Sequence, residues 1–120
     1  MAKNKVLVVE DEPALRKSYT RWLAAKGLEV VEPPAFSIPE IIGAFEDYSQ
    51  DMVCVICDGN LDTYFNGLDV VKAIRACDEN VKIITITSDD NLAEQMLEAG
   101  ANQRLNKPFE FDEFMRVVTG

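Results

Sequence analysis

The chain has 120 residues, a length that suits one domain with a single core, and its 12 Lys and Arg against 21 Asp and Glu give a formal net charge of −9. This charge opposes direct binding to nucleic acid or to anionic lipid surfaces. No apolar run is long enough for a membrane span or for the core of a signal peptide, so we expect a cytoplasmic location and no membrane partner.

Histidine and cysteine usage narrows the possible chemistry further. The chain has no histidine, which removes the commonest general base, the usual catalytic triads and the commonest zinc ligand. Cys54 and Cys57 have the spacing of redox and zinc motifs, but residues three apart in a strand point to opposite faces. We therefore expect both thiols to be small core residues rather than a disulfide or a metal site.

Strands and helices are expected to alternate from the start of the chain. The β-branched run 5–9 predicts a strand, and Pro13 fits the first turn of a helix that Gly27 ends. A second strand is expected over residues 28–31, and residues 37–40 have the form of a capping box at the start of a second helix. The expected core positions of these helices are Leu15, Tyr19, Trp22, Leu23, Ile41, Ile42 and Phe45.

The alternation continues with an apolar run over residues 52–57, which predicts a third strand. Gly67 begins the next expected helix, residues 82–87 predict a fourth strand, and the acidic run 89–91 suits the start of a helix that Gly100 ends. The expected core positions of these helices are Leu68, Val71, Ile74, Leu92, Met96 and Leu97.

Residues 102–105 predict a fifth strand, and their polar composition suits a short strand at the edge of a sheet. A last helix is expected over residues 111–119, with Phe111, Phe114, Met115 and Val118 on one face. Five strands alternating with five helices, without a repeat or an internal linker, predict a single α/β domain over residues 1–120, with one parallel sheet and helices on both faces. Several strand orders satisfy this pattern, which does not select among them.

Polar residues follow or end four of the predicted strands: Glu10 and Asp11, Asp58, Thr87, and Lys107. Each has an ordinary alternative, since Asp58 can begin a turn, Glu10, Asp11 and Thr87 can begin or cap helices, and Lys107 can be a surface lysine. In a parallel sheet, however, ligands bind beyond the carboxyl ends of the strands. Three carboxylates close together repel each other unless a cation or raised pKa values relieve them.

Magnesium fits this set best, because it prefers oxygen ligands and is usually held by one or two carboxylates together with phosphate oxygens. A carboxylate beside the ion can also attack a phosphoryl group and become an aspartyl phosphate. Asp58 has the residue type for that role. Lys107 and Thr87 have the types that balance charge on the transferred oxygens.

Four motifs together resemble the receiver domain of two-component response regulators: Val-Val-Glu10-Asp11-Glu-Pro, the apolar run into Asp58, Ile-Thr-Ile-Thr87-Ser88 and Lys107-Pro108-Phe109. The resemblance covers nearly the whole chain. It implies a flavodoxin-like fold with strand order 2-1-3-4-5, a cis bond between Lys107 and Pro108, and a histidine kinase or histidine phosphotransfer protein as phosphodonor. It also implies Mg²⁺ as cofactor, with Mn²⁺ as a possible substitute, and no enzymatic turnover beyond self-phosphorylation and self-dephosphorylation.

The resemblance further implies a role for each residue of the site. Asp58 would be the phosphoacceptor, and Thr87 and Lys107 would bind the phosphoryl oxygens. New charge on Asp58 would draw the Thr87 hydroxyl inward and switch the surface of the fourth helix, fifth strand and fifth helix. The implied metal ligands are Asp11, Asp58, Glu10 largely through water, and the main-chain carbonyl of Asn60.

The sequence departs from the family pattern at Arg104 and in the loop after Asp58. Arg104 stands where many receivers carry an aromatic residue that follows the threonine; it could swing toward Asp89 or Asp90, or be a fixed surface charge. Asn60 and Asp89, two residues beyond Asp58 and Thr87, would suit fairly fast self-dephosphorylation.

The loop after Asp58 has Leu61 and Asp62 where methionine and proline are common. Tyr64 and Phe65, in the same loop, would either fill a packing niche or contact a partner.

Three other functions remain open at this stage. A pseudo-receiver would bind proteins without being phosphorylated. A haloacid-dehalogenase-like phosphohydrolase would use Asp58 as nucleophile, but the second aspartate usual in such enzymes is replaced by Asn60. Flavin binding is opposed by the acidic rim and by the lack of a run that could cradle phosphate. The short last helix suggests a domain excised from, or forming the N-terminal part of, a longer regulator or hybrid kinase; whether a fused output domain follows is left open.

Overall fold

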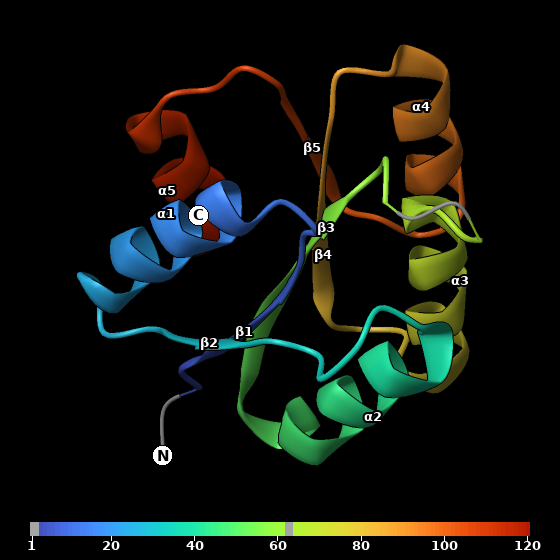
Figure 1. Cartoon of the computed structure of the whole chain (residues 1–120), viewed down its shortest axis with the longest axis horizontal. Coiled ribbons are helices and arrows are strands. Elements are labelled where there is room, and N and C mark those ends of the chain that lie inside the picture. Colours follow the sequence, from blue (N-terminus) through green and yellow to red (C-terminus); the bar gives the residue numbers. More distant parts are fainter. Residues whose placement is uncertain (1–2, 62–63) are drawn as a thin grey trace.

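Five parallel strands and five α-helices alternate along the chain in the computed structural model, which describes residues 3–61 and 64–120 (Figure 1). The strands are β1 (Lys5–Val9), β2 (Glu29–Val31), β3 (Met52–Asp58), β4 (Lys82–Thr87) and β5 (Gln103–Asn106). The helices are α1 (Pro13–Ala24), α2 (Ile38–Tyr48), α3 (Gly67–Cys77), α4 (Asp90–Glu98) and α5 (Phe111–Thr119), with a 3₁₀ turn, η1 (Ser49–Asp51), before β3. The predicted α/β class is confirmed.

The sheet has the order β2-β1-β3-β4-β5, and every neighbouring pair is parallel. This order confirms the one that the family resemblance implied. It makes β3 the central strand and β5 an edge strand, as the polar composition of β5 suggested. Since all strands run the same way, their carboxyl ends meet at one edge of the sheet.

The helices form a layer on each face of the sheet. Helices α1 and α5 cover one face, and α2, α3 and α4 cover the other (Figure 1). The alternation of side chains along β3 divides its residues between these layers. Cys54 packs with the α1 and α5 residues, whereas Cys57 packs with the α2, α3 and α4 residues. The two thiols therefore lie on opposite faces, as predicted, and burial raises the pKa of both, which disfavours the reactive thiolate form.

The helix ends follow the signals in the sequence. The Ser37 hydroxyl accepts a hydrogen bond from the Glu40 amide at the start of α2, and the Asp89 carboxylate accepts one from the Leu92 amide at the start of α4. Gly27 and Gly100 have positive φ values of 76° and 126°, which confirms that they end α1 and α4.

Several predicted core positions were wrong in detail. Leu97 is 38% exposed and Phe111 is 40% exposed, because both lie on helix faces turned partly to solvent. Phe111 still contacts the ring of Trp22 edge-on, with 5.5 Å between the ring centroids. Near the start of α3, Leu68 is only half-buried, whereas Val70 is fully buried. Strand β2 begins at Glu29 rather than Leu28, and β5 covers residues 103–106 rather than 102–105.

The loop after β3 only partly follows its prediction. Tyr64 is 92% exposed, so a packing role for this ring was wrong, whereas Phe65 is partly buried against the core on the α2, α3 and α4 side. The predictions for Asp62 and Thr63 fall outside the described residues.

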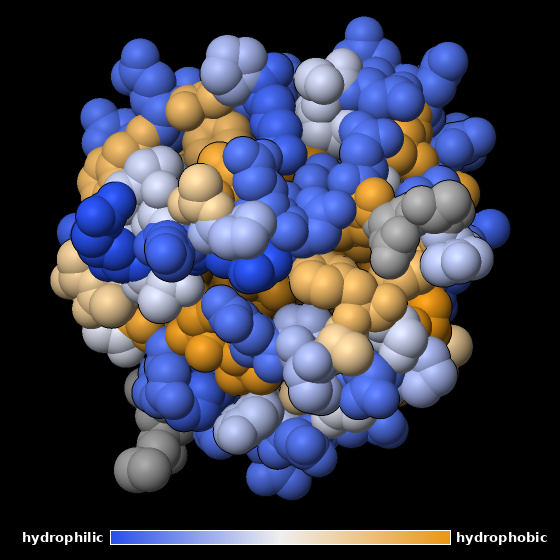
Figure 2. Space-filling model, viewed as in Figure 1, coloured by the Kyte–Doolittle hydropathy of each residue, from blue (hydrophilic) through white to orange (hydrophobic). Residues whose placement is uncertain are grey.

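Polar residues (blue) cover much of the face seen in Figure 2, with hydrophobic residues (orange) visible between them. This pattern agrees with a chain in which 28% of the residues are charged. Among the described residues, no helix is both long enough and apolar enough to span a membrane.

Candidate phosphoacceptor and metal site

The fold places Asp58 at the carboxyl end of the central strand. Strand β3 extends one residue further than predicted, so Asp58 is its last residue, and the side chain is 5% exposed. Neighbouring strands bring in the other predicted residues: Glu10 and Asp11 follow β1, Thr87 ends β4, and Lys107 follows β5. One edge of the sheet thus gathers residues that are up to 97 positions apart, from Glu10 to Lys107.

Three carboxylates form an acidic cluster at this edge. Glu10, Asp11 and Asp58 each offer an oxygen within 4.8 Å of those of the other two. Glu10 and Asp58 are buried, whereas Asp11 is exposed to solvent. The arrangement gives a hard cation several oxygen ligands with one side open to water, which is how proteins usually hold Mg²⁺.

Glu10 is buried in this cluster and has a raised pKa. Burial, and after it the negative charge of Asp58, raises the pKa of the Glu10 carboxyl to about 7. Its Oε2 accepts a hydrogen bond from the Glu12 amide at 3.2 Å. Its Oε1 is buried and has no hydrogen-bond partner among the described residues. The Lys107 ammonium lies 3.7 Å from this oxygen, too far for a hydrogen bond. A buried carboxylate oxygen without a hydrogen bond is costly, and a bound cation would relieve it, so the residues present fit a metal ion.

Lys107 supplies positive charge to this cluster. Its Nζ lies 3.3 Å from Asp58 Oδ2 and 3.7 Å from Glu10 Oε1. The peptide bond between Lys107 and Pro108 is cis, as the resemblance implied. The remaining oxygen of Asp58, Oδ1, accepts a hydrogen bond from the Asn60 amide at 3.2 Å, which is the bond of an Asx turn. The turn interpretation of Asp58 and the ligand interpretation are therefore compatible.

The Thr87 hydroxyl is hydrogen-bonded to one residue of the loop after β3 and to one residue of the loop after β4. Its oxygen accepts hydrogen bonds from Asn60 Nδ2 at 3.3 Å and from the Asp89 amide at 3.0 Å. Asn60 therefore contacts Thr87 through its side chain, and Asp89 contacts it through its main-chain amide. Their influence on dephosphorylation, and the Asn60 carbonyl as a metal ligand, stay predictions.

Arg104 also contacts Thr87, but through the main chain. Its Nη2 donates to the Thr87 carbonyl at 3.3 Å and pairs with the Asp90 carboxylate at 2.8 Å. Of the two acidic partners considered from the sequence, the guanidinium therefore meets Asp90, while Asp89 caps α4.

Two features of the site were missed by the sequence reasoning. Gly67 crosses directly over the end of β3, and a Cβ there would meet the Asp58 carbonyl and come within 2.9 Å of the Gly59 Cα. Its amide donates to the Gly59 carbonyl at 2.9 Å, which closes the loop around Asp58. Arg16 donates from Nη1 to the Glu10 carbonyl at 2.8 Å and so holds the acidic loop after β1. Of these two residues, only Gly67 could have been noticed in the sequence, because a glycine stands there at the predicted start of a helix.

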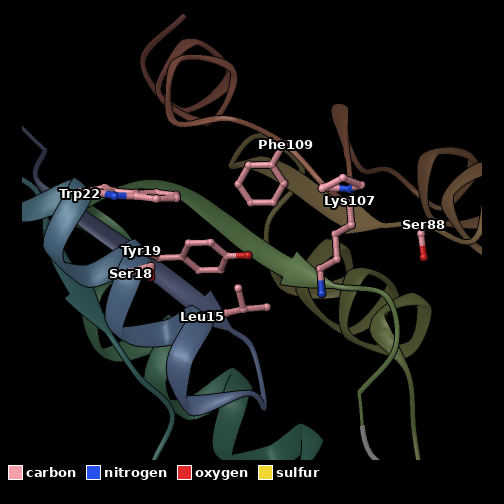
Figure 3. Close-up of a pocket in the computed structure, with 8 residues that line it drawn as sticks. Leu15, Ser18, Tyr19, Trp22, Ser88, Lys107 and Phe109 are labelled. Atoms are coloured by element: carbon pink, nitrogen blue, oxygen red, sulfur yellow. The ribbon is translucent and has the colours of Figure 1, made fainter.

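A largely apolar pocket of about 400 Å³ opens beside the site (Figure 3). It lies between α1 and the segment after β5, and its walls include Leu15, Tyr19, Trp22 and Phe109. The Tyr19 ring stacks on Phe109, with 6.1 Å between the centroids. Lys107 lines the same pocket, so the apolar surface is continuous with the charged site.

Comparison with known families gives a match over almost the whole chain. The sequence model of the response regulator receiver domain matches residues 6–119. Response regulator MprA of Mycobacterium avium is 29% identical over 113 residues, as is MprA of Mycobacterium tuberculosis. Each alignment covers 92% of this chain and 47% of the relative, so the chain spans about half the length of these curated relatives.

Solved structures give the same result. The receiver domain of a sensor histidine kinase from Pseudomonas aeruginosa PAO1, solved with a magnesium ion coordinated in its active site cleft, has a TM-score of 0.79 and 28% identity, covering 98% of this chain and 96% of that one. A probable two-component system response regulator/GGDEF domain protein has a TM-score of 0.83 and 28% identity, covering 97% and 48%. Chemotaxis protein CheY4 of Vibrio cholerae, at 24% identity and 98% coverage of both chains, shares the fold with a TM-score of 0.84.

Proposed function

Because the chain belongs to the response regulator receiver domain family, we propose that it accepts a phosphoryl group on Asp58, with Mg²⁺, from a phosphohistidine of a histidine kinase or histidine phosphotransfer protein. One observation carries this proposal. The buried Asp58 carboxylate lies in a cluster with Glu10 and Asp11 and accepts a hydrogen bond from Lys107 at 3.3 Å. The proposed nucleophile, two further carboxylates that can bind a metal ion, and a lysine ammonium that balances their charge therefore lie close together.

The transfer itself needs little chemistry from the protein beyond positioning and charge balance. A carboxylate oxygen of Asp58 attacks the phosphorus, a phosphorus–oxygen bond forms, and the phosphorus–nitrogen bond of the phosphohistidine breaks. The electron pair of that bond stays on the imidazole nitrogen of the donor. Lys107 and Thr87 then balance charge on the phosphoryl oxygens, the ammonium through its positive charge and the hydroxyl through a hydrogen bond.

The metal would be held by Asp11 and Asp58 directly, by Glu10 largely through water, and by the Asn60 carbonyl. When bound, Mg²⁺ neutralises charge on the phosphoryl oxygens and on the carboxylates. The unpartnered Glu10 oxygen supports such a cation, as does the magnesium of the Pseudomonas receiver domain. Mn²⁺, which also takes oxygen ligands, is proposed as a substitute.

A protein donor is supported by the apolar pocket beside Lys107. A small phosphodonor needs only the charged rim, whereas a helix that carries a phosphohistidine would also contact the surface around Asp58. Because the pocket adjoins Lys107, it offers apolar surface at that place. We further propose that the product is a single stoichiometric modification, and that the α4, β5 and α5 surface transmits it to a fused output domain or a separate protein.

The proposal is tested by the intact mass of the protein after incubation with acetyl phosphate. One phosphoryl addition is expected with Mg²⁺, and none with EDTA or in Asp58→Asn. Asp47→Asn, a change of an exposed carboxylate on α2, serves as the matched control and should be modified like the wild type. Absence of any addition in the wild type would instead identify a pseudo-receiver, and continuous release of phosphate from many esters would indicate a phosphohydrolase.

A further inference from the structure

Arg104 holds the two ends of the connection between β4 and α4. One nitrogen of its guanidinium, Nη2, contacts the carbonyl of Thr87 at 3.3 Å and the carboxylate of Asp90 at 2.8 Å. Thr87 is the last residue of β4, and Asp90 is the first residue of α4. A side chain from the edge strand β5 therefore bridges the segment that carries the Thr87 hydroxyl. We call these two contacts the Arg104 clasp.

The strand order places the Arg104 clasp and the Asp58 site on opposite sides of β4. Strand β4 lies between β3, which ends at Asp58, and β5, which carries Arg104. In the register, Asp58 pairs with Ile86, and Thr87 pairs with Asn106. A shift of Thr87 toward a phosphoryl group on Asp58 is consequently a shift away from β5. The Arg104 contact with the Thr87 carbonyl pulls in the other direction.

Two features of the clasp make it weak enough to open. The Arg104 side chain is 23% exposed and Asp90 is 89% exposed, so water screens their ion pair. The Nε of Arg104 is buried and has no hydrogen-bond partner among residues 3–61 and 64–120. A buried donor without a partner costs free energy, which lowers the net stability of the clasped arrangement.

We infer that Arg104 is a positioning residue that opposes the capture of Thr87 by phosphorylated Asp58, an inference that rests on the proposed function. If an arrangement at one site weakens binding at a second site, binding at the second site disfavours that arrangement by the same factor. Occupation of the Asp58 site therefore loosens the Arg104 clasp by the same factor by which the clasp weakens capture of Thr87. The clasp thus raises the threshold for switching the α4, β5 and α5 surface.

Beryllofluoride with Mg²⁺ tests this coupling, because it mimics a phosphoryl group on a carboxylate without being hydrolysed. Its dissociation constant is measured by titration for the wild type, Arg104→Met, Asp90→Asn and the double variant. Each single variant should bind about two- to fivefold more tightly, the range expected for a screened ion pair. The double variant should gain no more than the larger single effect, because both changes open one clasp. Arg104→Lys, which keeps the charge on a shorter side chain, should fall between the wild type and Arg104→Met.

Glu94→Gln is the matched control, since Glu94 is an exposed carboxylate on the same helix and makes no ion pair with another described residue. Its dissociation constant should equal that of the wild type. Thermal unfolding of each variant checks that it is folded. A second measurement needs no variant: the Nε–H signal of Arg104 in ¹H–¹⁵N spectra should exchange with solvent faster once beryllofluoride saturates the wild type.

The outcomes separate the two proposals. If the wild type binds beryllofluoride and the clasp variants bind with the affinity of Glu94→Gln or more weakly, the clasp is overturned while the phosphoacceptor site stands. An Arg104 Nε–H signal that is unchanged at saturation also overturns it. If the wild type neither binds beryllofluoride nor takes up a phosphoryl group, the proposed function fails, and the clasp inference fails with it.

Discussion

The Lys107 ammonium lies 3.3 Å from a carboxylate oxygen of Asp58, although the two residues are 49 positions apart in the chain. The pairing follows from the sheet: Asp58 ends the central strand and Lys107 follows the edge strand, with β4 between them. Lys107 also lies 3.7 Å from Glu10, so one cation faces two buried carboxylates. The proposed chemistry depends on this position of the ammonium.

Replacement of Lys107 by glutamine should slow phosphorylation of Asp58 by acetyl phosphate by about 10²-fold or more, the cost typical of removing one donor that stabilises transition-state charge. The rate is followed by intact mass at fixed Mg²⁺ concentration. Lys72→Gln, a change of an exposed lysine on α3, should leave the rate unchanged. Equal rates for both variants would remove Lys107 from the mechanism.

Mg²⁺ should stabilise the folded chain through the acidic cluster. At a free Mg²⁺ concentration of ten times the dissociation constant, the free energy of unfolding should rise by about 1.4 kcal/mol. Chemical denaturation with Mg²⁺ and with EDTA measures this difference. Asp11→Asn, which removes one carboxylate of the cluster, should reduce it, whereas Asp47→Asn on α2 should keep it. A similar gain in Asp11→Asn and in the wild type would place the ion elsewhere.

The raised pKa of Glu10 predicts a pH dependence of stability in metal-free buffer. Because the pKa is about 7 in the folded chain and 4.5 is its ordinary value, the folded state holds the proton more tightly than the unfolded state. The stabilisation is full below about pH 4.5 and is lost as the pH rises through about 7. We expect the wild type to lose about 1–2 kcal/mol relative to Glu10→Gln between pH 5 and pH 8, after allowance for screening by water.

Denaturation of the two proteins across this pH range measures the difference in the free energy of unfolding. The Glu10→Gln variant has no titrating group at this position, so the acids of the chain that do not interact with Glu10 cancel in the comparison. Parallel pH profiles would show that Glu10 is ionised alike in the folded and unfolded chain, against the burial seen here.

The crossing of Gly67 over Asp58 predicts an unequal pair of glycine substitutions. In Gly67→Ala the new methyl group would meet the Asp58 carbonyl, the Met96 side chain and Gly59, so a loss of about 1–3 kcal/mol in stability is expected. In Gly43→Ala no atom lies within 4 Å of the new methyl group, and α2 should gain about 0.5–1 kcal/mol. Chemical denaturation measures both. A neutral Gly67→Ala would mean that the loop after β3 shifts freely.

Local patterns in the sequence were sufficient to predict the strands, the helices and the rim residues. The residues Glu10, Asp58 and Thr87 could be placed together because the carboxyl ends of parallel strands share one edge of the sheet. The strand order needed the family resemblance, since periodicity reports what each segment is and not which segments are neighbours. The residue types alone favoured magnesium, because this ion prefers oxygen ligands.

Other details depend on tertiary distances that no local pattern contains. Asp90 as the partner of Arg104 follows from how α4 sits against β5, and Gly67 is special only because α3 begins over the end of β3. Leu97 and Tyr64 have apolar or aromatic side chains but face solvent, because the neighbouring elements leave these positions uncovered. Hydrophobicity predicts a buried face on average and does not decide each residue.

The most direct test of the phosphoacceptor proposal is the intact mass of the wild type and of Asp58→Asn after acetyl phosphate, each with Mg²⁺ and with EDTA. We expect one phosphoryl addition, and only in the wild type with Mg²⁺. An addition that persists in Asp58→Asn, or no addition in the wild type with Mg²⁺, would contradict the proposal.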